Sequence, residues 1–170
     1  MKYLMVLSGK GGVGKTIVAV NLARKLSEKG TKVELIDGDI TNPNCAELLG
    51  IKEQIRVSAE SFTPLTIDGI EFFSMETISQ GRPVAMHASE YAQIIRDVFR
   101  HTPWTAEIGI LDMPATITDT FLEVITTFGE NLLGSIIVLQ PAHVESARKT
   151  LQLHKNEGVP VLGVIKNMSN

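Results

Sequence analysis

The stretch VLSGKGGVGKT, residues 6–16, joins a short apolar run to four glycines, two lysines and a threonine. From Gly9 onward it fits the pattern G-x-x-x-x-G-K-[ST], in which glycines let successive backbone N–H groups turn toward one anion. A helix that begins directly after the loop adds the positive end of its dipole. The stretch therefore predicts a phosphate-binding loop between a buried strand and a helix. The alternative is a glycine-rich turn with an incidental lysine.

On both sides of this loop, short apolar runs alternate with amphipathic segments. The expected strands are 3–7, 32–37, 70–75, 107–112, 135–140 and 160–165, and the expected helices are 15–29, 89–100, 119–128 and 143–156. Most of the apolar runs lack the alternation of a half-exposed strand, so helices should cover both faces of the sheet. We therefore expect one α/β domain over residues 1–170, with a doubly wound, mostly parallel sheet. The sequence TIDGI, residues 66–70, predicts an Asp-Gly hairpin.

Composition excludes several kinds of protein. The chain has 170 residues, a formal net charge of −3 and a single cysteine. One cysteine rules out a disulfide framework and a four-cysteine zinc or iron–sulfur site within one chain. The acidic balance gives no strong nucleic-acid signal, and no apolar run is long enough for a membrane segment. These features favour a cytoplasmic protein.

The phosphate-binding motif also predicts which residues hold a nucleotide. Lys15 is placed to reach the β- and γ-phosphates, and the Thr16 hydroxyl is placed to ligate Mg²⁺. The predicted nucleotide-binding residues of this stretch are Gly11, Gly12, Val13, Gly14, Lys15, Thr16 and Ile17.

Three aspartates stand at the ends of predicted strands. Asp37 closes the run 32–37, Asp39 follows two residues later, and Asp112 closes the run 107–112. Phosphoryl transfer needs carboxylates of this kind to hold Mg²⁺ and to orient water. The alternative is that Asp37 and Asp39 cap the backbone amides of a turn.

The first lysine of the loop, Lys10, is not needed for the phosphate cradle. The sequence KGGVGKT, residues 10–16, resembles the deviant Walker A signature of the MinD/ParA/Mrp/nitrogenase-iron-protein class of P-loop ATPases. That resemblance implies a homodimer formed across ATP, in which Lys10 reaches the phosphates bound by the partner. It makes Lys10, Lys15 and Asp39 the expected catalytic residues. The alternative for Lys10 is a solvated surface lysine.

Two further segments resemble the Mrp branch of this class. DMPATITD (112–119) resembles DLPPGTGD, and GVIKNMSN (163–170) resembles GVVENMS. The resemblance implies that Asp37 and Asp112 hold Mg²⁺ through water, and that Asp39 positions the attacking water. It implies that Asn167 reads the adenine edge, although an asparagine there can also cap a strand end. Thr116 and Thr118 replace glycines of the family, which predicts slow ATP hydrolysis.

The function implied is a slow Mg-ATPase that switches by ATP-dependent dimerisation, binds ATP and ADP, and acts with a client protein in iron–sulfur cluster assembly or delivery. The alternatives are a MinD/ParA-like spatial organiser and a nucleotide-binding regulatory module with little turnover. Cluster-carrying members have a cysteine pair after the NMS segment. This chain is C-terminally short relative to the family, so we expect no iron–sulfur cluster in it alone. Two copies could share a metal through Cys45, although a lone buried or loop cysteine is commoner; Arg82 receives no role.

Overall fold

The computed structural model describes residues 1–39, 42–52, 56–57, 62–79, 88–115 and 119–169. The main sheet contains β1 (Lys2–Ser8), β2 (Val33–Asp37), β5 (Leu65–Ile67), β6 (Ile70–Phe73), β7 (Ile108–Asp112), β8 (Leu132–Leu139) and β9 (Val161–Lys166). A separate ribbon pairs β3 (Arg56–Val57) with β4 (Phe62–Thr63). The helices are α1 (Lys15–Glu28), α2 (Cys45–Leu49), α3 (Met75–Ser79), α4 (Ala88–His101), α5 (Asp119–Phe128) and α6 (Val144–Asn156), with short 3₁₀ turns at Gly129–Asn131 and Pro141–His143.

The main sheet has seven strands in the order β5-β6-β2-β7-β1-β8-β9. Neighbouring strands are parallel from β6 to β9, and β5 pairs with β6 antiparallel. In the turn between those two strands, Asp68 and Gly69 both have positive φ angles, as a tight two-residue hairpin requires. The predicted hairpin is therefore confirmed.

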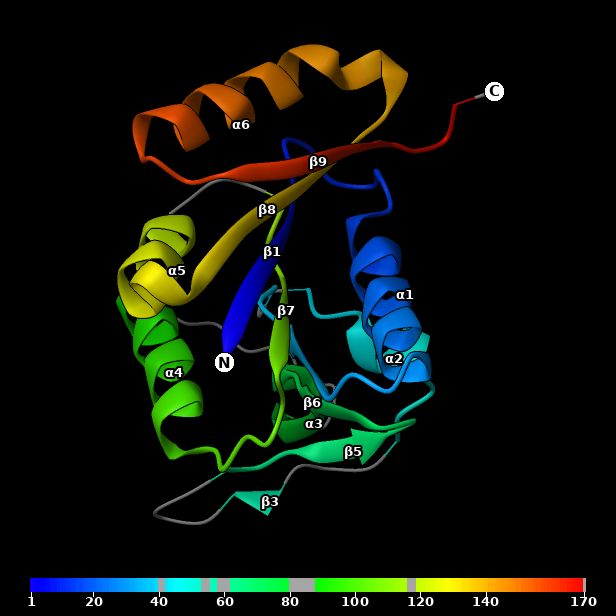
Figure 1. Cartoon of the computed structure of the whole chain (residues 1–170), viewed down its shortest axis with the longest axis vertical. Helices are drawn as coiled ribbons and strands as arrows, with labels where there is room; N and C mark the ends of the chain where they lie inside the picture. The colour runs from blue at the N-terminus through cyan, green and yellow to red at the C-terminus, as the bar shows by residue number, and fades with distance from the viewer. Residues whose placement is uncertain (40–41, 53–55, 58–61, 80–87, 116–118, 170) are drawn as a thin grey trace.

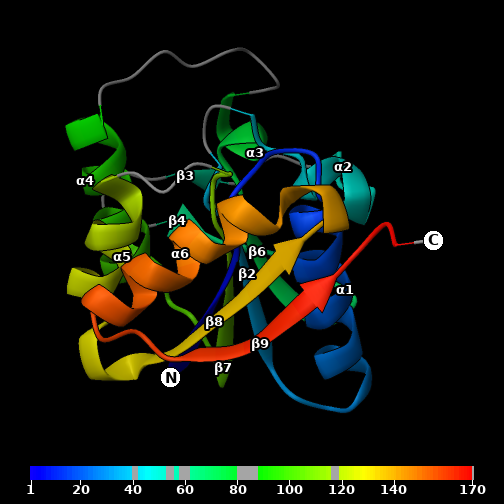
Figure 2. The same cartoon turned by 90° about the horizontal axis from the view of Figure 1, so that it is seen from above.

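Helices cover both faces of this sheet, as Figures 1 and 2 show. Alternate residues of β1 point into two different cores. Met5 and Leu7 face a cluster that includes residues of α4 and α5, whereas Leu4 and Val6 face a cluster that includes residues of α1 and α2. Because both faces are buried, the strand is apolar along nearly its whole length.

The predicted doubly wound α/β fold is confirmed, with each of the six predicted strands and four predicted helices present. The predicted strand 70–75 was wrong at its C-terminal end, because β6 stops at Phe73 and α3 begins at Met75. The short helix α2 was not predicted at all. Arg82, Thr116 and Thr118 lie outside the described residues.

The strand order also places the functional site. Strand β1 lies between β7 and β8; the chain leaves β1 through α1 toward β2 on one side, and β8 and β9 extend the sheet on the other. In open parallel sheets, ligands bind outside the carboxyl ends of the strands at such a reversal of order. The segments that follow β1, β2 and β7 should therefore form one site.

One carboxyl group is buried far from that edge. Glu34 in β2 has no measurable exposure, and neither of its carboxylate oxygens has a hydrogen-bond partner among the described residues. Burial, together with the nearby charge of Glu71, raises the pKa of Glu34 to about 9. The side chain is thus held in its neutral form in the folded protein.

This burial predicts a stability that falls with rising pH. Between the ordinary carboxyl pKa of 4.5 and about 9, the folded state keeps a proton on Glu34 that the unfolded state releases. The stabilising contribution is therefore complete below pH 4.5 and is lost as the pH rises toward 9, by at most ~1.4 kcal/mol per pH unit. We expect Glu34→Gln to remove this slope in urea unfolding between pH 6 and 9. The exposed Glu107→Gln is the control, and an unchanged slope in Glu34→Gln would contradict the assignment.

Candidate functional site

The loop between β1 and α1 has a backbone shape that glycine adopts most easily. Gly12 and Gly14 have φ angles of 79° and 88°, in the region that residues with a Cβ disfavour. Val13 between them is buried in the core under α1. Gly9 lies so close to α6 that a Cβ would stand 2.6 Å from the Ser146 carbonyl oxygen. The loop is therefore fixed at several points along its length.

A cavity of about 530 Å³ opens beside this loop. The predicted site residues that line it are Gly11, Gly12, Gly14, Lys15, Thr16, Ile17 and Asp39. Asp37 and Asp112, the last residues of β2 and β7, are buried and do not line it. The cavity thus brings together the glycine-rich loop, the start of α1 and the segment after β2.

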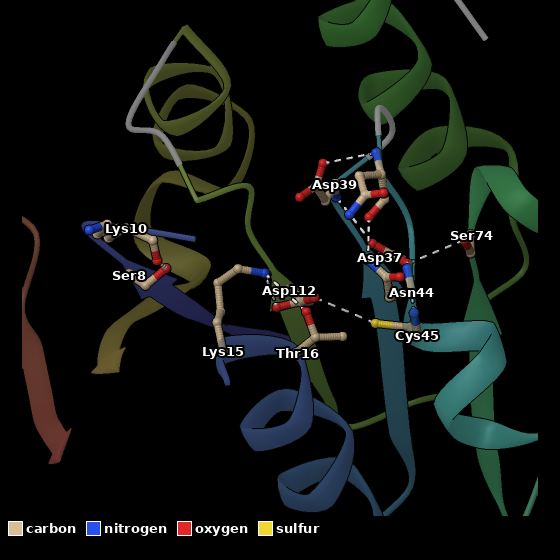
Figure 3. A network of polar contacts seen from close by, with 11 residues as sticks. Ser8, Lys10, Lys15, Thr16, Asp37, Asp39, Asn44, Cys45, Ser74 and Asp112 are labelled. Atoms are coloured by element: carbon tan, nitrogen blue, oxygen red, sulfur yellow. Dashed lines mark hydrogen bonds and ion pairs between the residues drawn. The ribbon is translucent and has the colours of Figure 1, made fainter. Parts of the chain in front are cut away.

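Lys15 connects the cavity with the buried carboxylates. It is the first residue of α1, and its Nζ donates to Asp112 Oδ1 at 2.6 Å and to Thr16 Oγ1 at 3.3 Å (Figure 3). Lys15 is 7% exposed and Asp112 is 1% exposed, so this ion pair is almost free of solvent. Burial raises the pKa of Asp112, and Lys15 opposes that rise through its charge and its hydrogen bond.

Asp37 is held by backbone amides of the following segment. Its Oδ2 accepts from the N–H groups of Asn44 and Cys45, each at 3.0 Å, and its Oδ1 accepts from Asp39 N–H at 3.1 Å. Burial and the charge of Asp112 raise the pKa of Asp37 to about 7, although the amides of Cys45 and Asp39 and the charge of Lys15 lower it. Both the turn-capping geometry and the proximity to Asp112 that a metal site needs are therefore present.

Lys10 and Asn167 lie outside the cavity. Lys10 is exposed, and its side chain points away from Lys15 (Figure 3). Asn167, just after β9, donates through Nδ2 to the Val13 carbonyl at 2.8 Å. It lines a second hollow of about 340 Å³ between α1 and β9, together with Ile17 and Ile165. The structure thus places Asn167 next to the phosphate-binding loop and leaves Lys10 at its outer rim.

Sequence reasoning missed the contribution of α2. Cys45 is the first residue of this helix and is fully buried, so it does not lie in an open loop. Its Sγ lies 3.6 Å from Asp112 Oδ2. The signals for the helix were present in the sequence, because Asn44 stands at the N-cap position and Gly50 at the C-cap.

The whole chain, residues 1–170, matches the ParA family model described as NUBPL iron-transfer P-loop NTPase. The chain belongs to this family of P-loop NTPases. Within the family, it is 34% identical over 173 residues to an iron-sulfur cluster carrier protein of Deinococcus radiodurans, with 98% of this chain and 49% of that protein aligned. The resemblance to the Mrp and MinD classes that the motifs indicated is therefore confirmed.

Solved structures share the family fold. A nucleotide-binding protein of Archaeoglobus fulgidus in complex with ADP superimposes with a TM-score of 0.80 at 27% identity, covering 98% of this chain and 66% of that one. MinD of Pyrococcus horikoshii, complexed with Mg-ADP, superimposes with a TM-score of 0.70 at 21% identity, covering 97% and 69%. The second likeness concerns the fold alone.

The chain covers only part of its relatives. The chain spans about half the length of the curated relatives it matches, such as 49% of the D. radiodurans protein. None of the helices described here has the length and apolarity needed to cross a bilayer.

Proposed function

We propose that this family member is a Mg²⁺-dependent ATPase with slow turnover, that its ATP-bound form dimerises, and that this cycle serves iron–sulfur cluster assembly or delivery to a client protein. The observation that carries the proposal is the convergence of four residues beside the glycine-rich loop. Lys15 and Thr16 line the 530 Å³ cavity, and Asp37 and Asp112 are buried directly behind them. The name of the D. radiodurans relative supports the role in cluster metabolism, and the ADP complex of the A. fulgidus protein supports nucleotide binding.

Thr16 in the cavity and the two carboxylates buried behind it fit a hydrated Mg²⁺. Among the described residues, two buried carboxyl groups, Asp37 and Asp112, face the ammonium of Lys15, and a bound cation would favour the ionised form of both. The Thr16 hydroxyl beside Asp112 supplies a neutral oxygen ligand. Mg²⁺ bound there would neutralise charge on the phosphate oxygens during phosphoryl transfer. When a nucleotide enters, Lys15 exchanges Asp112 for phosphate oxygens, and the loop N–H groups donate to the same phosphates.

Asp39 is the residue we assign to the attacking water. It lines the cavity, and its Oδ1 accepts from Asn42 N–H at 3.2 Å, which holds the carboxylate in the segment after β2. A carboxylate at that place can accept a proton from water and orient its lone pair toward the phosphate.

Asn167 is the residue we assign to the adenine edge. Its Nδ2 already donates to the Val13 carbonyl, which leaves Oδ1 to accept from another donor. The exocyclic amino group of adenine is such a donor, whereas guanine has a carbonyl oxygen at the same position. The apolar side chains of Ile17 and Ile165 in the same hollow suit the faces of a purine ring.

Lys10 provides the test of the dimer. Its ammonium is exposed and points away from the phosphate pocket of its own chain, as a residue acting on a partner's nucleotide would. By light scattering, we expect the solution mass to double with a slowly hydrolysed ATP analogue and Mg²⁺, but not with ADP. We expect Lys10→Ala to stay monomeric while it still binds the analogue.

The matched control is Lys29→Ala, which removes another exposed lysine at the end of α1 and should dimerise like the wild type. If the solution mass is the same with and without the ATP analogue, ATP-dependent dimerisation is excluded. A Lys10→Ala protein that dimerises normally would show that this lysine does not act across an interface.

A further inference from the structure

Three potential metal ligands of different chemistry meet at one point behind the cavity. They are Asp37 at the end of β2, Cys45 at the start of α2 and Asp112 at the end of β7. One ligand atom from each lies within 4.8 Å of the other two, and all three side chains are buried. Figure 3 shows these side chains converging from three separate elements.

The backbone around the cluster fixes this convergence. Strands β2 and β7 pair so that Asp37 lies directly beside Asp112. The N–H groups of Asn44 and Cys45 donate to Asp37 Oδ2, and these bonds hold the first turn of α2 against the end of β2. The Cys45 thiol is thereby held where it donates to Asp112 Oδ2, with Sγ and Oδ2 3.6 Å apart. This sulfur–oxygen separation is close to that of two ligands on one tetrahedral zinc ion.

Asp37 and Asp112 alone suit Mg²⁺, but the addition of Cys45 changes which metal ions the cluster prefers. Mg²⁺ prefers oxygen ligands and retains its waters, whereas a thiolate selects softer ions such as Zn²⁺, Co²⁺ or Fe²⁺. Two carboxylates and a thiolate would supply three negative ligands to a divalent ion. Lys15 is the cation that now contacts this cluster: its Nζ lies 2.6 Å from Asp112 Oδ1, on the side of that carboxylate opposite Cys45 (Figure 3).

We propose that Asp37, Cys45 and Asp112 form a binding site for a thiophilic divalent transition-metal ion. The ion forms bonds to Sγ and to one oxygen of each carboxylate, and the thiol proton leaves to solvent without any change of oxidation state. Lys15, which lines the cavity and contacts Asp112, moves aside to admit the ion. This site goes beyond the proposed function, because it binds metal without a nucleotide and depends on Cys45, which the ATPase does not need.

The first test is a titration of the nucleotide-free, reduced 170-residue chain with CoCl₂, followed by absorption. Cys45 is the single cysteine of the sequence, so a thiolate-to-cobalt charge-transfer band reports this residue alone. We expect the band at one Co²⁺ per chain, with displacement by Zn²⁺ and none by Mg²⁺. Cys45→Ser should lose the band and bind Zn²⁺ more weakly by over 100-fold, since loss of a supporting group alone costs roughly 10- to 100-fold.

Two further variants sharpen the result. Glu47→Gln, an exposed position in the first turn of α2, should bind Co²⁺ like the wild type. Lys15→Met should bind Co²⁺ more tightly, by roughly 10-fold or more, because it removes the ammonium that competes for Asp112. A metal that merely adheres to surface carboxylates would not respond to Lys15.

Three outcomes would overturn the site: no charge-transfer band in the wild type, a band that survives Cys45→Ser, or one Co²⁺ shared by two chains. Failure here is distinguishable from failure of the ATPase proposal. Cys45→Ser should still bind Mg-ADP, whereas Lys15→Met should lose the nucleotide and keep the metal.

Discussion

Lys15→Met is expected to abolish nucleotide binding and to destabilise the empty protein. The ammonium of Lys15 is the cation placed to meet the phosphates, and truncating one member of a buried charge pair costs about 2–5 kcal/mol. We therefore expect the affinity for Mg-ADP to fall by at least ~100-fold, measured by calorimetry.

The loss of stability has a separate cause. Without Lys15, Asp37 and Asp112 remain buried beside each other with their main counter-charge removed. Breaking a buried ion pair from one side costs about 3–5 kcal/mol when the remaining charge cannot be neutralised. Here the carboxyl groups can take up protons, because burial already raises the pKa of both and Lys15 opposes that rise. The difference in free energy of unfolding between the wild type and Lys15→Met should therefore become smaller as the pH is lowered from 8 to 6.

The measurement is urea unfolding of both proteins at several pH values. Lys25→Met on the same helix is the control, because the Lys25–Glu28 pair is 71% and 60% exposed and should contribute well under ~1 kcal/mol. If Lys15→Met unfolds like the wild type at pH 8, the ion pair with Asp112 does not stabilise the fold.

Gly134→Ala is expected to be the most damaging glycine substitution in the sheet. Gly134 has a φ of 139°, at a register shift between β1 and β8. A Cβ there would overlap the backbone carbonyl oxygen of Pro160, which accepts from Ser135 N–H at 2.9 Å. Since the obstacle is backbone, β9 would have to move away from β8.

We expect the free energy of unfolding to fall by about 3 kcal/mol, because the unfavourable φ costs about 1–3 kcal/mol and the displaced strand adds to it. Because Asn167 follows β9, nucleotide affinity should fall as well. Gly163→Ala is the control, since a Cβ at Gly163 meets no atom within 4 Å. Its free energy of unfolding should stay within about 0.5 kcal/mol of the wild type. Equal stability of the two variants would show that β9 adjusts freely.

Much of the fold could be predicted because its signals are local. Strands such as β1 are apolar along their length because helices bury both of their faces, so their composition predicts a covered sheet. The glycines of residues 9–14 likewise predict the loop before α1. The short helix α2 escaped prediction because five residues give too little periodicity to separate a helical turn from a loop.

The candidate site was predictable in its parts but not in its assembly. The strand-end positions of Asp37 and Asp112 follow from the sequence, and the parallel sheet then places them side by side. The position of Cys45 depends on two backbone amides, seven and eight residues beyond Asp37, that donate to its carboxylate. The sequence gives no periodic signal for contacts of that kind. The burial of Glu34 without a hydrogen-bond partner among the described residues could not be predicted for a similar reason, since it depends on which helices cover β2.

The closeness of Gly9 to α6 has a mechanical consequence. A methyl group at Gly9 would not fit beside Ser146, so the phosphate-binding loop and α6 are in close contact at this point. Close-packed protein interiors pass displacement on rather than absorbing it. Any shift of the loop at Gly9 must therefore be matched by a shift of α6, on which Val144 and Leu151 are 44% and 39% exposed. A change in the position of the loop at Gly9 would thus change how these two apolar side chains are presented at the protein surface.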